Sequence, residues 1–106
     1  MDVVMARFQD LKPPRFFGTE SAERAEAWLK DIEHLFNIVE YSKARRLKLA
    51  LYQLKDRAKS WWEAAEIGLK EAGIEVTWDV FKAHFLEQYS PPSYYTAQEN
   101  EFNNLQ

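Results

Sequence analysis

The fold of this protein can be predicted outward from residues 47–65, LKLALYQLKDRAKSWWEAA. The apolar residues of this stretch recur every three or four positions: Leu47, Ala50, Leu51, Leu54, Ala58, Trp61, Trp62 and Ala65. At about 100° of rotation per residue, they share one face of a helix. One long helix fits this pattern, and so do two helices with a corner near Asp56. We predict two, because Asp56 can cap a second helix and an uninterrupted helix would be long for so small a domain.

Similar stripes flank this stretch on both sides. Upstream, Thr19 or Ser21 can cap a helix whose apolar face is Ala25, Trp28, Leu29, Ile32, Leu35, Phe36 and Val39. After Gly73, Thr77 can cap a helix whose apolar face is Trp78, Phe81, Phe85 and Tyr89. A last pattern over 94–106 predicts a helix that the end of the chain truncates. Because no strand-period segment of useful length follows residue 20, we predict an all-α bundle of about five helices.

The predicted core combines the large apolar residues of these stripes. It consists of Trp28, Ile32, Phe36, Leu51, Leu54, Trp61, Trp62, Trp78, Phe81 and Phe85. The four tryptophans could instead form a platform for stacking bases, but their place on the stripes favours burial. Trp61 and Trp62 are about 100° apart on a helix, so we expect one of them at the edge of the face, open to a partner.

Residues 1–20 differ in character from the helical lobe that we expect over 21–106. Two prolines disfavour helix here, so we predict an extended N-terminal arm. The arm carries apolar side chains that would be costly to leave in water, and its candidate interface residues are Phe8, Leu11, Pro13, Pro14, Phe16 and Phe17. The arm could dock in a groove of its own lobe. It could equally dock on a neighbour and exchange between two copies.

Composition excludes several classes of protein. The 106 residues suit one domain, and with no cysteine there is no disulfide scaffold, thiolate zinc site or cysteine nucleophile. No apolar run is long enough for a membrane span, and the N-terminus lacks the pattern of a secretory signal. We therefore expect an intracellular protein, cytoplasmic or nuclear.

Charge is segregated along the chain despite a net charge of only −3. Residues 43–59 are strongly basic, whereas 60–106 are acidic. The candidate charged interface is Lys43, Arg45, Arg46, Lys48, Arg57 and Lys59. Such a run can simply be a solvated helix face. It can also contact the acidic stretch of a neighbouring copy, whereas RNA binding has little support because aromatic residues do not interleave with the basic ones.

Motifs for chemistry are missing from the sequence. The serines lie in no nucleophile-elbow context, and the chain contains neither a Gly-rich phosphate loop nor an aspartic-protease signature. His34 and His84 fall on polar faces, and two histidines without cysteine make a structural zinc site improbable. We expect no catalytic residues, no metal site and no cofactor.

An ordered series of motifs carries a family resemblance. The series is Pro13-Pro14-x-Phe16-x-Gly18-Thr19, Ala27-Trp28-Leu29-x-x-Ile32-Glu33-x-x-Phe36, Leu49-Ala50-x-x-x-Leu54-x-x-x-Ala58-x-x-Trp61-Trp62, Thr77-Trp78-x-x-Phe81-x-x-x-Phe85-x-x-x-Tyr89-x-Pro91 and Glu101-Phe102-x-x-Leu105-Gln106. It resembles the gag domain of Ty3/gypsy-type long-terminal-repeat retrotransposons, plant elements above all. One departure is Asp56, since the family often has glycine between the second and third helices.

The resemblance implies a capsid N-terminal lobe, a structural protein that packs side by side in a shell. The lobe alone would associate weakly, because the family's second capsid lobe is missing here. A domesticated lobe acting as a peptide-binding adaptor is the alternative. An extended peptide would then occupy the groove that the arm otherwise fills, and deleting residues 1–17 should open that groove. RNA chaperoning ranks last, and it predicts binding with a steep dependence on salt.

Overall fold

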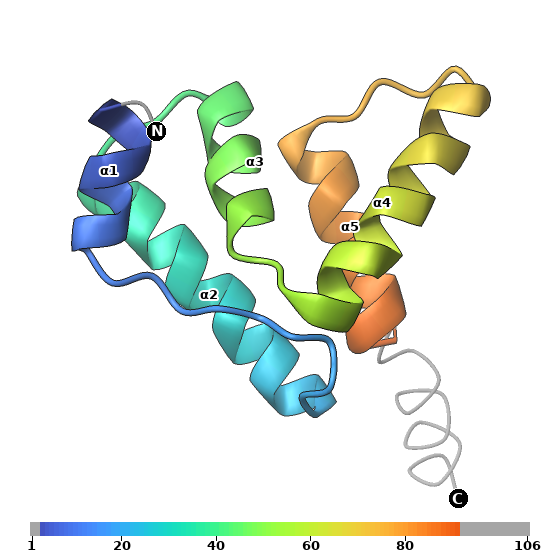
Figure 1. Cartoon of the computed structure of the whole chain (residues 1–106), viewed down its shortest axis with the longest axis horizontal. Helices are drawn as coiled ribbons and strands as arrows, with labels where there is room; N and C mark the ends of the chain where they lie inside the picture. The colour runs from blue at the N-terminus through green and yellow to red at the C-terminus, as the bar shows by residue number, and fades with distance from the viewer. Residues whose placement is uncertain (1–2, 92–106) are drawn as a thin grey trace, which may run out of the picture.

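The computed structural model describes residues 3–91, which form five α-helices (Figure 1). The helices are α1 (Val3–Asp10), α2 (Ala22–Ile38), α3 (Lys43–Tyr52), α4 (Asp56–Glu71) and α5 (Trp78–Tyr89). Within the described residues the only β-type pairing is an isolated bridge between Phe16 and Leu54. The all-α prediction is therefore confirmed. The helix expected over 94–106 lies outside the described residues.

Three of the helices begin at hydroxyl caps. Ser21 Oγ accepts a hydrogen bond from the Arg24 N–H at 3.3 Å, and Ser42 Oγ accepts one from the Arg45 N–H at 3.3 Å. Thr77 Oγ1 accepts from Val80 N–H at 3.2 Å, as its position before the stripe predicts. Each cap satisfies a backbone donor that the first turn of a helix leaves free.

The stretch around residue 56 forms two helices, as predicted, but Asp56 does not cap the second. The N-cap of α4 is Lys55, without a side-chain capping bond. Asp56 has φ +48°, in the left-handed region that favours glycine. Glycine adopts this backbone conformation most readily. Asp is one of the few other residues that adopt it readily.

The N-terminal arm is not extended over its whole length, which corrects the prediction. Residues 3–10 form α1, and this helix buries Phe8 completely. The Phe8 ring lies 5.8 Å from that of Phe36 and 6.1 Å from that of Tyr41. An eight-residue helix is marginal by itself, so packing of its apolar face stabilises it. The sequence pattern was too short to reveal this. Residues 11–20, which we call the extended segment, connect α1 to α2.

The core lies where all five helices and the extended segment meet. Of the ten residues predicted for it, the structure buries Trp28, Ile32, Phe36, Leu54, Trp62, Trp78, Phe81 and Phe85. Leu51 and Trp61 are only partly buried and pack against its edge. Trp61, not Trp62, is thus the partly open member of the pair.

Candidate interaction surface

The extended segment docks along the corner between α3 and α4 of its own chain. Phe16 donates its N–H to the Gln53 carbonyl at 2.9 Å and accepts from Lys55 N–H at 2.8 Å. One residue on, the Phe17 carbonyl accepts from Ala58 N–H at 3.1 Å. The Ala58 N–H also donates to the Lys55 carbonyl at 3.0 Å, so the extended segment supplies a second acceptor for an N-terminal donor of α4 that no side chain caps.

Gln53 fixes the segment from inside the corner. Its side chain is 1% exposed, and its Nε2 donates to the carbonyls of Pro13 at 3.1 Å and Pro14 at 3.2 Å. Its Oε1 accepts from Gln9 Nε2 at 2.8 Å. Trp28 Nε1 also donates to the Pro14 carbonyl, at 2.9 Å. Gln53 was not among the residues predicted from the sequence. The available signal was a polar residue between Leu51 and Leu54, which both belong to the apolar stripe.

The Phe16 side chain enters the aromatic core. It is fully buried, and its ring lies 5.5 Å from Trp28, 4.9 Å from Phe85 and 4.8 Å from Tyr89. Tyr89 in turn lies 5.1 Å from Trp61. Of the two docking modes that the sequence left open, the structure has the segment in the groove of its own lobe.

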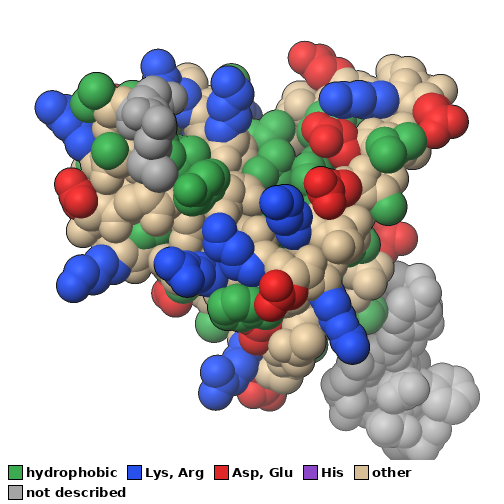
Figure 2. Space-filling view, in the orientation of Figure 1, with side chains coloured by type: hydrophobic (Ala, Val, Ile, Leu, Met, Phe, Trp, Pro, Cys, Tyr) green, Lys and Arg blue, Asp and Glu red, His purple; other side chains and the backbone are tan. Residues whose placement is uncertain are grey.

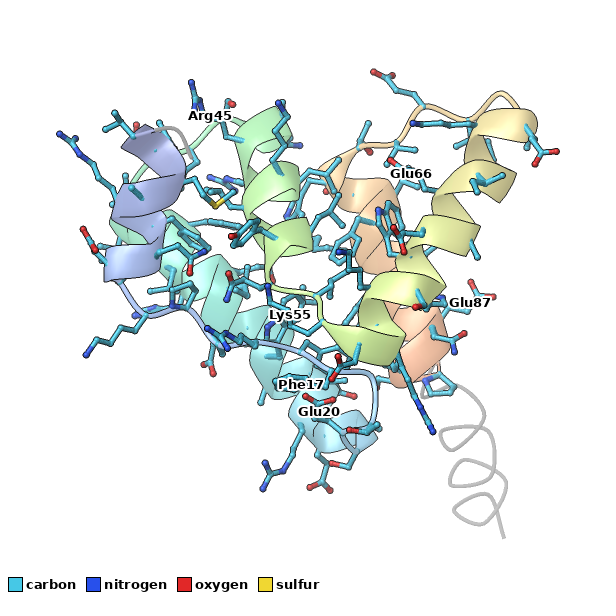
Figure 3. The ribbon with its side chains drawn as sticks, viewed as in Figure 1. Phe17, Glu20, Arg45, Lys55, Glu66 and Glu87 are labelled. Atoms are coloured by element: carbon cyan, nitrogen blue, oxygen red, sulfur yellow. The ribbon has the colours of Figure 1, made fainter. Side chains whose placement is uncertain are left out.

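A tight turn ends the extended segment. The Glu20 carboxylate accepts hydrogen bonds from the N–H groups of Phe17, Gly18 and Thr19 at 2.9–3.2 Å (Figure 3). Gly18 has φ +92°, and a Cβ there would lie 2.7 Å from the Ala58 nitrogen. Glycine is therefore required at this position by both conformation and close approach.

The predicted interface arm divides into core and surface residues. Phe8, Pro13 and Phe16 are buried, and Pro14 is half-buried. Leu11 and Phe17 remain 37% and 38% exposed. Only these two leave apolar side chains available to a partner.

The charged residues gather on different parts of one face. Figure 2 shows Lys and Arg side chains over α1, α3 and the start of α4, while Asp and Glu side chains dominate around the far end of α4 and its connection to α5. Charges of both signs mix over the extended segment and the start of α2. The segregation read from the sequence is thus also a segregation in space. It gives this face a dipolar character.

The six predicted basic residues have different surroundings. Lys43 Nζ pairs with Asp79 at 3.3 Å, and Arg46 Nε donates to the Tyr41 carbonyl at 3.0 Å. These two contacts lie within the lobe. The other four, Arg45, Lys48, Arg57 and Lys59, are exposed, and their side chains form no ion pair with any residue in the described range.

Neither a metal site nor a membrane-spanning helix is present among residues 3–91. No three His, Asp or Glu side chains among them converge as a metal ion would require. His34 is exposed, while His84 Nδ1 lies 3.2 Å from the Val80 carbonyl of its own helix. None of the five helices in this part of the chain has the length and apolar composition that crossing a bilayer requires.

A comparison with family models identifies the family of this chain. Residues 10–90 match the N-terminal capsid-like domain of the retrotransposon-derived protein PEG10. This chain belongs to that capsid-like family. Searches of curated proteins and of solved structures found no match. The predicted gag capsid N-terminal domain is confirmed, and the family is a structural, non-catalytic one.

The matched region shows which parts of the chain make the capsid-like lobe. It begins at Asp10, the last residue of α1, and therefore contains the whole extended segment together with α2 to α5. The extended segment is thus an integral part of the capsid-like domain. Helix α1 lies almost entirely before the match and packs onto it through Phe8.

We expect Phe16→Ala to destabilise the capsid-like domain by about 3–5 kcal/mol, because it removes a fully buried ring from an aromatic cluster. Phe17→Ala is the matched control and should cost about 1 kcal/mol or less, since Phe17 is partly exposed. Urea unfolding followed by tryptophan fluorescence measures both. If Phe16→Ala does not fold, Phe16→Leu provides the smaller, measurable loss. Equal losses for the two alanine variants would contradict the docking.

Gly18→Ala should destabilise the domain by about 3 kcal/mol, because the new Cβ meets backbone and the φ is unfavourable. Gly73→Ala separates the two causes. Gly73 has φ +74° but nothing within 4 Å of a Cβ, so only the conformational cost of about 1 kcal/mol remains. Thermal unfolding of both variants measures the difference. A Gly18→Ala loss no larger than that of Gly73→Ala would show that the approach to Ala58 is not tight.

The pKa of Tyr89 is raised above its ordinary value by burial and, secondarily, by the charge of Glu20. The folded state therefore holds the phenolic proton more tightly than the unfolded chain does. This contribution to stability is complete below about pH 10, the ordinary tyrosine pKa, and is lost as pH rises through the folded value. Urea unfolding between neutral pH and pH 11 should show a steeper loss for the wild type than for Tyr89→Phe. Identical pH profiles would contradict this assignment.

Proposed function

We propose that this capsid-like domain acts by self-association, packing side by side with further copies as the N-terminal lobe of a Ty3/gypsy-type gag or of a gene derived from one. The observation that carries the proposal is the division of one face into a basic and an acidic part. Four exposed cations of α3 and the start of α4 have no ion-pair partner within the described chain. An acidic surface on a neighbour can supply the partners.

The contact that fits this charge distribution is heterologous. Basic residues of α3 and the start of α4 on one copy would meet the acidic end of α4 on the next. Phe17 and Tyr52 are 38% and 45% exposed, and they offer apolar area beside the basic stretch. Exposed charge pairs are individually weak, so an isolated lobe should associate weakly and sensitively to salt.

A peptide-binding adaptor finds less support in this arrangement. The groove that an extended peptide would need is filled by residues 13–18 of the chain, with Phe16 fully buried in it. Removing residues 1–17 would take away the buried Phe8 as well as Phe16. Loss of two core rings would unfold the lobe rather than open a binding site.

Sedimentation velocity over a concentration series, at low and at high salt, tests self-association. We expect a monomer–oligomer equilibrium that shifts toward monomer at high salt. Lys59→Glu should weaken it about threefold, because one attractive charge contact becomes repulsive. A glutamate in the first turns of α4 also suits the helix dipole, so folding should not suffer.

Arg24→Glu is the matched control. Arg24 is likewise exposed near the start of a helix, and its reversal changes net charge by the same amount, but it lies outside the basic stretch 43–59. It should leave the equilibrium nearly unchanged. A monomer at every concentration, or equal effects of the two reversals, would contradict the proposal.

A further inference from the structure

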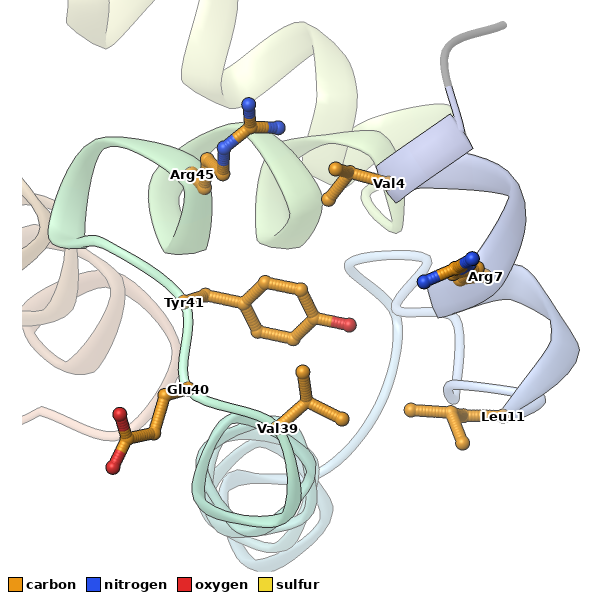
Figure 4. Close-up of a pocket in the computed structure, with 7 residues that line it drawn as sticks. All are labelled: Val4, Arg7, Leu11, Val39, Glu40, Tyr41 and Arg45. Atoms are coloured by element: carbon orange, nitrogen blue, oxygen red, sulfur yellow. The ribbon is translucent and has the colours of Figure 1, made fainter.

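A separate pocket lies at the junction of α1, α2 and α3 (Figure 4). Its volume is about 440 Å³, comparable to a small-molecule or side-chain binding site. The residues that matter for what it could bind are Val4, Arg7, Leu11, Val39, Tyr41 and Arg45. It is distinct from the groove that Phe16 fills, which lies at the corner of α3 and α4.

The floor of this pocket is held in place by the core. The Tyr41 ring packs edge-on against Phe8 at 6.1 Å and against Phe36 at 5.9 Å. Its carbonyl accepts the Arg46 hydrogen bond, which fixes the connection between α2 and α3. The pocket is therefore preformed, and binding would not have to order its floor.

Two guanidinium groups face solvent around this apolar floor. Arg7 on α1 and Arg45 on α3 are exposed, and neither forms an ion pair with any residue from 3 to 91. In Figure 4, Arg7 lies on the side of the Tyr41 hydroxyl, and the Glu40 carboxylate points away from the pocket. The Arg45 guanidinium lies at the outer edge of α3, farther from the Tyr41 ring than Arg7 in this view. Lys48 lines a smaller hollow beside it, together with Arg45. The site thus combines apolar surface with unpaired positive charge, which suits a segment carrying carboxylates next to bulky apolar residues.

The sequence of residues 92–106 has this chemistry. Its only charged side chains are Glu99 and Glu101, and Phe102 follows Glu101 directly, with Leu105 three residues further on. The segment starts beyond α5, whose end lies across the molecule from α1 (Figure 1). A pocket on a second copy is therefore the better-placed receptor.

We propose that the pocket of Arg7, Tyr41 and Arg45 binds residues 99–105 of another copy of this chain. The glutamates pair with the two arginines, while Phe102 or Leu105 enters the apolar part formed by Leu11, Val39 and Tyr41. Repeated from copy to copy, this head-to-tail contact adds a second link to the side-by-side packing. The inference rests on the proposed self-association, which it deepens by naming a receptor and its ligand.

The test is fluorescence polarisation with a labelled synthetic peptide of residues 92–106 titrated with the full chain. We expect saturable binding that weakens about tenfold with Arg7→Gln, the cost of losing one charge-assisted contact. Val39→Glu should weaken it at least as much, because it places a like charge beside the peptide's glutamates. Both substituted residues are exposed, so the fold should persist. Arg24→Gln, outside the pocket, should leave binding unchanged.

The outcomes are distinct. No saturable binding, or equal binding by Arg7→Gln and Arg24→Gln, overturns the proposed receptor. Equal binding of a scrambled peptide overturns residues 99–105 as its specific ligand and leaves a general site for acidic, apolar peptides. Neither Arg7 nor Val39 belongs to the basic stretch 43–59, so sedimentation of the Lys59→Glu variant tests the side-by-side contact separately. If the chain forms oligomers in sedimentation but does not bind the peptide, only this inference is overturned, and the proposed self-association stands.

Discussion

The structure depends on one residue of the extended segment. Phe16 exchanges backbone hydrogen bonds with Gln53 and Lys55 while its ring fills the space between Trp28, Phe85 and Tyr89. Where one helix ends and the next begins, backbone N–H and C=O groups have no partners within the helices. The space between the aromatic rings must also be filled, because protein cores are close-packed. At the corner of α3 and α4, the Phe16 backbone meets the first requirement and its ring meets the second. The helices α2, α3, α4 and α5 are consequently held together by a segment that has no helical structure itself.

Much of this arrangement follows from the sequence, and the exceptions have physical reasons. The stripes of α2 and α5 and the corner near Asp56 could be predicted because apolar spacing and caps act locally. Helix α1 could not be predicted, because a helix of only eight residues is marginal by itself and depends here on the packing of Phe8. The role of Gln53 also escaped, because its partners Pro13 and Pro14 are about forty residues away. The docking of the extended segment in its own chain could not be predicted for the same reason, because it also depends on contacts between residues that are distant in the sequence.

The division between core and surface limits where partners can bind. Residues of the arm that looked available, Phe8 and Phe16, are buried, whereas Leu11 and Phe17 stay partly exposed. Lys43 and Arg46 have partners within the lobe, while Arg45, Lys48, Arg57 and Lys59 have no ion pair in the described range. The self-association that we propose needs a rigid body and modest contacts that can be repeated. The aromatic core supplies the first, and the segregated charges and the pocket at Tyr41 are our candidates for the second.

We infer that Phe16 holds together the lobe of its own chain. An isotope-filtered NOE experiment on a mixture of labelled and unlabelled chains can establish this. Contacts of the Phe16 ring with Trp28 and Phe85 should appear within one chain and not between chains. Contacts between Phe16 of one chain and Trp28 of another would instead show an exchanged arm, and Phe16 would then not hold its own lobe together.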